Sequence, residues 1–136
     1  MHRKFVQSFC QLGRLNEVPE ELFMSLGTFV CLLYGDKTST TVDECRYHLF
    51  NSGKYSDDAL PPNYDSLPQN VKRANFQSFA WNRCLSAQLK LPTPAGNGWK
   101  LTDGQLEIVW MTRPSAAESF LQHIKCKCLK GCKTNR

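Results

Sequence analysis

A run of regularly spaced apolar residues between Pro19 and Gly35 constrains the fold most strongly. Its apolar side chains recur every three or four residues, which predicts one face of a continuous helix: Leu22, Phe23, Leu26, Phe29, Val30 and Leu33. Pro19 suits the first turn, and Gly35 provides the stop. The width of the apolar face places this helix at the centre of the core, and Gly27 is expected to let another helix approach closely.

Two shorter helices are predicted on either side of it. Phe5, Phe9 and Leu12 share one face, and Gly13 follows where a C-cap glycine would stand. Thr41 and Glu44 match a capping box, so a third helix should begin there, bury Val42, Cys45 and Leu49, and end at Asn51-Ser52-Gly53.

A longer fourth helix is predicted after a linker at residues 54–64, which contains Pro61-Pro62. Asp65 is the expected N-cap, and Pro68 falls in the first turn. The spacing predicts this buried face: Leu67, Val71, Ala74, Ser78, Trp81 and Leu85. Ser115 and Glu118 match a second capping box, which predicts a short helix leading to Cys126.

A β-hairpin is predicted between the last two helices. Trp99–Leu101 and Leu106–Trp110 flank an Asp103-Gly104 turn, and both tryptophans should pack on the helices. The expected fold is mainly α: a small bundle of four to five helices with a short β-hairpin and a disordered basic tail. Residues 1–87 form the expected helical domain, 88–124 the loop, hairpin and short helix packed on it, and 125–136 the cysteine tail.

The length of 136 residues suits a single core, and no apolar run approaches the roughly 20 residues of a membrane span. The N-terminus lacks the apolar core of a signal peptide, so an intracellular location is expected, with the nucleus as a candidate. The net charge of +5 lies entirely in residues 119–136, which contain five Lys or Arg and no acidic residue.

The seven cysteines are an odd number, which argues against a closed disulfide framework. Four lie within apolar helical patterns and are expected in the core: Cys10, Cys31, Cys45 and Cys84. The other three, Cys126, Cys128 and Cys132, are spaced closely enough to share one metal ion, and zinc is the expected metal. A fourth ligand could come from His123, water, a second chain or cysteines beyond Arg136.

The basic residues of the tail suggest contact with an anionic partner, most naturally nucleic acid. These candidate binding residues are Lys125, Lys127, Lys130, Lys133 and Arg136. A solvated basic terminus is the plainer alternative. A second basic and aromatic surface is conceivable on the fourth helix, from Lys72, Arg73 and Arg83 beside Phe76 and Phe79, although cations bordering a core helix explain the same pattern.

Catalytic patterns are weak. Cys84 with His48 or His123, and Asp57 with Asp58 or Asp65, could be paired, but no spacing supports either arrangement. The chain is therefore not expected to be an enzyme.

Several motifs follow one another in a distinctive order: Phe29 to Gly35, the helix from Thr41 to Phe50, Leu60-Pro61-Pro62, Arg73 to Trp81, Leu91-Pro92-x-Pro94 to Trp99, Asp103-Gly104, and Cys126 to Arg136. This order resembles the C-terminal part of a multicopy animal protein family associated with mobile elements. The resemblance implies a PIN- or flap-nuclease-like region upstream and an end similar to the Tesmin/TSO1-like CXC motif, a zinc-binding cluster associated with DNA binding. Cys126, Cys128 and Cys132 correspond to that motif, so the tail is expected to be a truncated version of it.

Three hypotheses follow. The first is a non-enzymatic fragment of a mobile-element-derived protein with a partial zinc-binding and DNA-binding tail. The second is a helical protein-interaction or accessory domain of an upstream nuclease-like region. The third is a degenerate product without a retained function.

Overall fold

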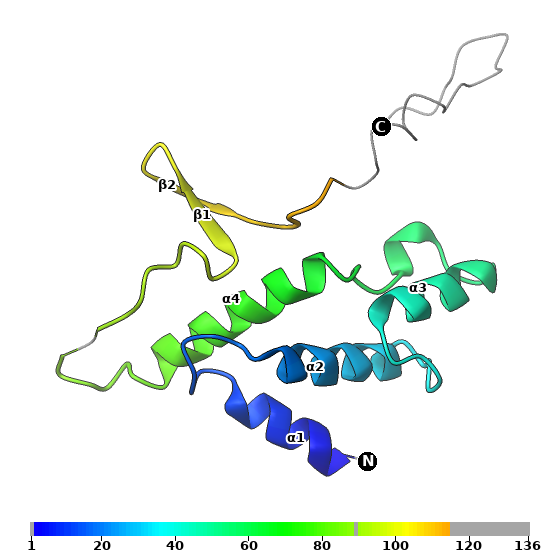
Figure 1. Ribbon diagram of the computed structural model, residues 1–136, viewed down its shortest axis with the longest axis horizontal. Helices are drawn as coiled ribbons and strands as arrows, with labels where there is room; N and C mark the ends of the chain where they lie inside the picture. Colours follow the sequence, from blue (N-terminus) through cyan, green and yellow to red (C-terminus); the bar gives the residue numbers. More distant parts are fainter. Residues whose placement is uncertain (1, 89, 115–136) are drawn as a thin grey trace, which may run out of the picture.

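The computed structural model describes residues 2–88 and 90–114. Within them the chain forms four α-helices and one antiparallel hairpin, which confirms the predicted mainly helical fold (Figure 1). The helices are α1 (His2–Gln11), α2 (Glu20–Leu33), α3 (Val42–Asn51) and α4 (Ser66–Trp81), with a 3-10 turn at Asp57–Ala59 in the linker before α4. The hairpin consists of β1 (Trp99–Thr102) and β2 (Gln105–Ile108).

Helix α2 occupies the centre, as its wide apolar face predicts. It contacts each of the other three helices, and Figure 1 shows it running between α1 and α4. The main buried cluster joins α2, α3 and α4 through Leu22, Leu26, Cys31, Val42, Cys45, Leu67 and Val71. A Cβ added to Gly27 would lie 3.7 Å from Leu67 Cδ2, so α2 and α4 approach closely at this glycine with just enough room for a methyl group.

The predicted caps and turns are largely confirmed. Thr41 Oγ1 accepts a hydrogen bond from the Glu44 amide, while the Glu44 carboxylate accepts one from the Thr41 amide. Asp103 and Gly104 have φ values of 50° and 79°, as a tight hairpin turn requires. Paired residues on the two strands place Trp99, Leu101, Leu106 and Ile108 on one side of the hairpin.

Two predictions about α4 are wrong. Asp65 precedes the helix but makes no side-chain cap; Asn63 Oδ1 instead accepts the hydrogen bond of the Ser66 amide at 2.7 Å. The buried face follows a spacing of four, through Leu67, Val71, Asn75 and Phe79. Trp81 and Leu85, which the predicted face included, have 65% and 97% of their surface exposed.

Asn75 explains why the buried face of α4 differs from the predicted one. Its polar amide occupies an interior position where the apolar pattern does not reveal burial. Its Oδ1 accepts a hydrogen bond from the Gly13 amide at 2.8 Å, and its Nδ2 donates to Leu15 O at 3.0 Å. The turn between α1 and α2 is therefore fastened to α4. Gly13 has φ +76°, and a Cβ at this position would lie 2.6 Å from the backbone carbon of Ser78.

Candidate functional site

The residues expected to bind zinc and nucleic acid lie outside the described part of the chain. These are the cysteines Cys126, Cys128 and Cys132 and the cations Lys125, Lys127, Lys130, Lys133 and Arg136. His123 and the second capping box, Ser115 to Glu118, also lie there. The chemistry described below is that of the helical body.

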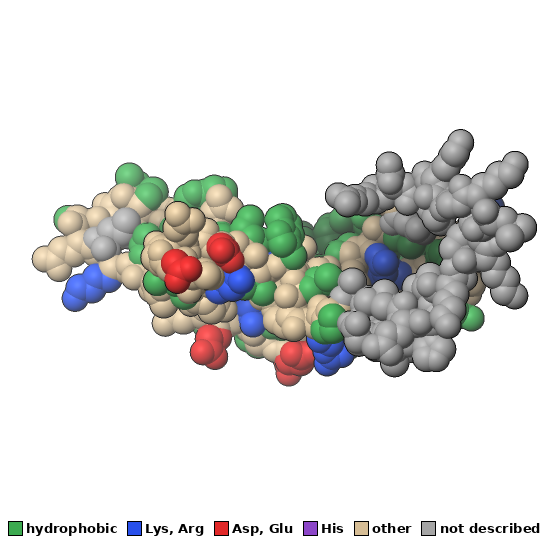
Figure 2. Space-filling view, turned by 90° about the horizontal axis from the view of Figure 1, so that it is seen from above, with side chains coloured by type: hydrophobic (Ala, Val, Ile, Leu, Met, Phe, Trp, Pro, Cys, Tyr) green, Lys and Arg blue, Asp and Glu red, His purple; other side chains and the backbone are tan. Residues whose placement is uncertain are grey.

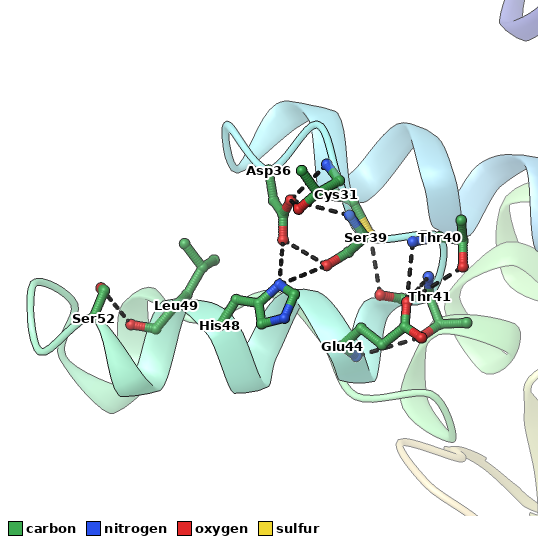
Figure 3. A network of polar contacts seen from close by, with 10 residues as sticks. Cys31, Asp36, Ser39, Thr40, Thr41, Glu44, His48, Leu49 and Ser52 are labelled. Atoms are coloured by element: carbon green, nitrogen blue, oxygen red, sulfur yellow. Dashed lines mark hydrogen bonds and ion pairs between the residues drawn. The ribbon is translucent and has the colours of Figure 1, made fainter.

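The densest polar cluster of the body joins the end of α2 to α3 (Figure 3). Asp36 Oδ2 accepts a hydrogen bond from Ser39 Oγ at 2.6 Å and lies 3.3 Å from His48 Nδ1. Ser39 Oγ lies 3.1 Å from the same ring nitrogen. The other carboxylate oxygen of Asp36 accepts hydrogen bonds from the Thr38 amide and hydroxyl at 2.8 and 2.7 Å.

A serine, a histidine and an aspartate thus lie together, but their geometry differs from a hydrolytic triad. In a triad, serine and aspartate contact opposite nitrogens of the imidazole, so that the unprotonated nitrogen can accept the serine proton. Here both contact Nδ1, and the Ser39 hydroxyl donates to Asp36. Ser39 is also 5% exposed, out of reach of a substrate. The cluster therefore closes the loop between two helices and has no activated nucleophile.

The Asp36 carboxylate is held in its charged form. Hydrogen bonds from Ser39 and then Thr38 keep the pKa of Asp36 well below its ordinary value of 3.8. Its side chain is 8% exposed, whereas that of His48 is 54% exposed. This carboxylate stabilises the turn that carries the chain from α2 into the capping box of α3.

Cys31 and Cys45 lie beside this loop and are both fully buried. Cys31 Sγ donates to Thr41 O at 3.3 Å. Burial raises the pKa of both thiols, and that of Cys45 to about 12, with a further contribution from the neighbouring Cys31. Since the thiolate is the reactive and metal-binding form, these two cysteines behave as core residues, as predicted. The same prediction is wrong for Cys10 and Cys84, which are exposed.

Among the described residues, the pairings of Cys84 with His48 and of Asp57 with Asp65 receive no support from the contacts, whereas His123 lies outside the described part. His48 contacts Asp36 and Ser39 rather than Cys84, and Asp65 is bound by Thr112 and Arg113. Among residues 2–88 and 90–114, no group of three or more His, Cys, Asp or Glu side chains is arranged to hold a metal ion.

The hairpin is anchored to α4 mainly by Arg73. Its Nη1 donates to Gly98 O at 3.1 Å and to Val109 O at 2.7 Å, so one guanidinium joins the two chain segments at the base of the hairpin. The same guanidinium lies 5.4 Å from the centre of the Trp110 ring. The rings of Phe76 and Trp99 meet edge to face at 5.5 Å. The predicted packing on a helix is thus confirmed for Trp99, whereas Trp110 faces only the Arg73 guanidinium and is 65% exposed.

These contacts also account for the basic and aromatic residues of α4. Phe79 is 8% exposed, and the Arg83 guanidinium lies 3.5 Å from the centre of its ring. Arg83 Nη1 donates to Gly13 O at 3.2 Å. Arg73, Arg83 and both phenylalanines are engaged with the body, which fits cations bordering a core helix. The suggested nucleic-acid surface on α4, which also includes Lys72, stays a prediction.

A second anchor of the hairpin lies at the start of α4. The Asp65 carboxylate accepts hydrogen bonds from the amide and hydroxyl of Thr112 and from the Arg113 amide, the last at 2.8 Å. The Thr112 hydroxyl and the Arg113 amide lower the pKa of Asp65. Asn63 Nδ2 lies 3.1 Å from Met111 Sδ, so two side chains beside α4 hold residues 111–113.

The body also has an open apolar groove between α1, α2 and α4. It has a volume of about 260 Å³ and is lined by Phe9, Leu12, Leu26, Phe29, Val30, Leu67, Asn70, Val71 and Ala74. Large apolar side chains are exposed elsewhere too, including Leu101 and Leu106 at 64% and 50%. Figure 2 shows such side chains beside charged ones on the face seen from above.

Sequence reasoning missed Asn75, the Asp36 cluster and the contact of Asp65 with Thr112. Only Asp36 had a usable local signal, because an aspartate followed by threonine and serine commonly accepts hydrogen bonds from the next residues of a turn. The other two contacts join residues 62 and 47 positions apart.

No family model, curated protein or solved structure matches the chain. No helix within the described residues has the length and apolar composition needed to cross a membrane. The resemblance to a mobile-element family therefore remains a prediction from the motifs.

Proposed function

We propose that the chain is a non-enzymatic, mobile-element-derived protein whose helical body supports a basic cysteine tail. The tail binds one zinc ion through Cys126, Cys128 and Cys132 and nucleic acid through its lysines and Arg136. The observation that carries the proposal is the location of charge. Residues 1–118 contain 12 basic and 12 acidic residues, whereas 119–136 contain five basic residues and no acidic one. Phosphate backbones attract such a segment, and thiolates at this spacing suit zinc.

The arrangement of charge in the body supports this division of roles. Arg73 and Arg83 donate to backbone carbonyls, and Lys100 pairs with Glu107 across the hairpin at 2.9 Å. Asp36 and Asp65 bind neighbouring hydroxyls and amides. These charged groups of the body are engaged in contacts that stabilise the fold. The excess of basic over acidic residues lies in residues 119–136.

The zinc part is tested on the full, reduced chain by native mass spectrometry. We expect one bound zinc ion per chain and its loss in Cys126→Ser, Cys128→Ser or Cys132→Ser. Cys84→Ser is the matched control, because this thiol is exposed on the body and should leave the zinc content unchanged. A reduced wild-type chain without zinc would contradict this part.

The nucleic-acid part is tested by fluorescence anisotropy with a short DNA duplex over a range of salt concentrations. Replacing Lys127, Lys130 and Lys133 by Gln should weaken binding and lower the salt slope by about one unit for each lost phosphate contact. Replacing Lys54, Lys72 and Lys90 by Gln removes the same charge from the body and should have little effect. Equal effects of the two triple variants would show that binding is not specific to the tail.

The second candidate is a helical interaction or accessory domain of a nuclease-like region, and the exposed apolar groove favours it. The two candidates differ in their dependence on the tail. Removal of residues 125–136 should abolish zinc and DNA binding if the first is correct. If DNA binding survives the deletion and Cys126→Ser, the first is excluded. A chain that binds neither zinc nor DNA, with or without the tail, would favour the interaction domain or a degenerate product.

A further inference from the structure

The contact between Thr112 and Asp65 differs from the other threonine–carboxylate contacts of the body. Thr38 also donates to a carboxylate, that of Asp36, but those residues are two positions apart and the contact shapes only a turn. Thr112 and Asp65 are 47 positions apart, and their hydrogen bond fastens the segment after the hairpin to the start of α4. We name residues 111–113, together with Asn63 and Asp65, the latch.

The Thr112 hydroxyl is accessible to a modifying enzyme. The residue is exposed and lies outside regular secondary structure. Beside it is an open cleft of about 190 Å³, lined by Asp43, Asn63, Tyr64, Asp65, Met111, Arg113 and Pro114. The cleft provides room for a phosphoryl group next to this side chain.

We infer that Thr112 is a phosphorylation site for a protein kinase and that phosphate on this residue opens the latch. In the transfer, Thr112 Oγ1 attacks the γ-phosphorus of ATP, a new O–P bond forms, and the bond from this phosphorus to the bridging oxygen breaks. ADP leaves with the bond electrons, and the hydroxyl proton passes to the base of the kinase.

Phosphorylation reverses the interaction at this point. The hydroxyl now donates a hydrogen bond to Asp65, whereas a phosphate carries nearly two negative charges and mainly accepts hydrogen bonds. Asp65 would face it directly, and Asp43 lines the same cleft. Arg113 is the nearby cation among the described lining residues, so two carboxylates oppose one guanidinium. Repulsion should therefore free residues 111–113 from α4, whether or not the tail binds nucleic acid.

Hydrogen exchange on the full chain tests the opening. Thr112→Glu should raise the exchange rates of the hairpin amides about tenfold, because a cost near 1.4 kcal/mol changes an opening equilibrium by that factor. Thr112→Val removes the hydroxyl without adding charge and should have a much smaller effect. Thr38→Glu is the matched control, since it places the same charge beside Asp36, whose contacts lie in the loop between α2 and α3 and on α3 rather than at the hairpin, and it should leave hairpin exchange unchanged.

Slow exchange in α2 and α4 must persist in Thr112→Glu, which separates opening from unfolding. If Thr112→Glu and Thr112→Val exchange alike, or if Thr112→Glu unfolds α2 and α4 as well, the latch is not opened by charge and the inference is wrong.

The modification is tested by incubating the full chain with magnesium ATP and an extract of the cells that express it, followed by peptide mass spectrometry. We expect phosphothreonine at position 112, faster hairpin exchange in the phosphorylated protein, and recovery after phosphatase treatment. Absence of phosphate from Thr112 under these conditions overturns the assignment.

Discussion

Two residues, Gly13 and Asn75, show how single side chains decide the packing of this small domain. Asn75 is 3% exposed and uses its amide to bind the backbone of the turn between α1 and α2. Gly13 lets that turn lie directly against the backbone of α4. The contact requires both a buried amide and a missing side chain, so the contact cannot be replaced by apolar packing alone.

Gly13→Ala should destabilise the protein strongly. The new methyl group would meet the α4 backbone at 2.6 Å, and alanine rarely adopts φ +76°. We expect a loss of about 3 kcal/mol in the free energy of unfolding, measured by urea titration. Gly53→Ala is the control, because Gly53 also has a positive φ of 64° but nothing lies within 4 Å of its Cβ position. The loss in Gly53→Ala should stay near 1 kcal/mol. Equal losses in the two variants would show that backbone strain, rather than the contact with α4, causes the destabilisation.

At the level of secondary-structure elements, the hairpin depends on α4. Two strands of four residues are marginal by themselves, and every residue of β2 is exposed. The base of the hairpin is held by Arg73 on one side and by Asp65 on the other. Its orientation is therefore set mainly by these two polar side chains, together with the contact between Phe76 and Trp99.

Arg73→Lys should undock the hairpin while the helices remain folded. Lysine keeps the charge but cannot place a planar guanidinium against two carbonyls and the Trp110 ring. The expected result is a shift of tryptophan fluorescence toward that of solvent-exposed indole, with an unchanged helical circular dichroism signal. Lys72→Ala changes the adjacent position as a control, and a similar fluorescence shift in that variant would contradict the assigned role of Arg73.

The loop between α2 and α3 should make the free energy of unfolding depend on pH in the acidic range. Because the pKa of Asp36 is depressed in the folded state, its contribution is present above the unfolded value of 3.8 and is lost as the pH falls below it. The urea midpoint of the wild type should thus stay nearly constant down to about pH 5 and decrease between about pH 4 and about pH 2. Asp36→Asn should be less stable at the higher pH and lose less on acidification. Parallel losses in both proteins would assign the acid sensitivity to other carboxylates, such as Asp65.

The elements that could be predicted from the sequence are those with local determinants. The capping box joins residues three positions apart, and the hairpin turn depends on Asp103 and its neighbour Gly104. The face of α4 could not be predicted, because Asn75 is buried only through a turn that lies 62 positions earlier. Asp65 has the composition of an N-cap, yet its carboxylate is bound by residues 47 and 48 positions later.

At the scale of the whole molecule, the buried core of the described residues is formed by the helices. Its buried apolar residues lie between Phe5 and Phe79, and the hairpin rests on their outer side. Removal of residues 125–136 should therefore leave the melting temperature nearly unchanged. Thermal unfolding followed by circular dichroism measures this directly. A large decrease would mean that the tail contributes to the fold as well as to the proposed binding.

The fastening of Gly13 to α4 has a consequence for the order in which a growing chain can fold. The turn between α1 and α2 gains its amide partner only when Asn75 has been made, 62 residues after Gly13. At 5 to 20 residues per second this takes about 3 to 12 seconds. During that interval the nascent pair lacks its final register, and the arrival of α4 completes the core.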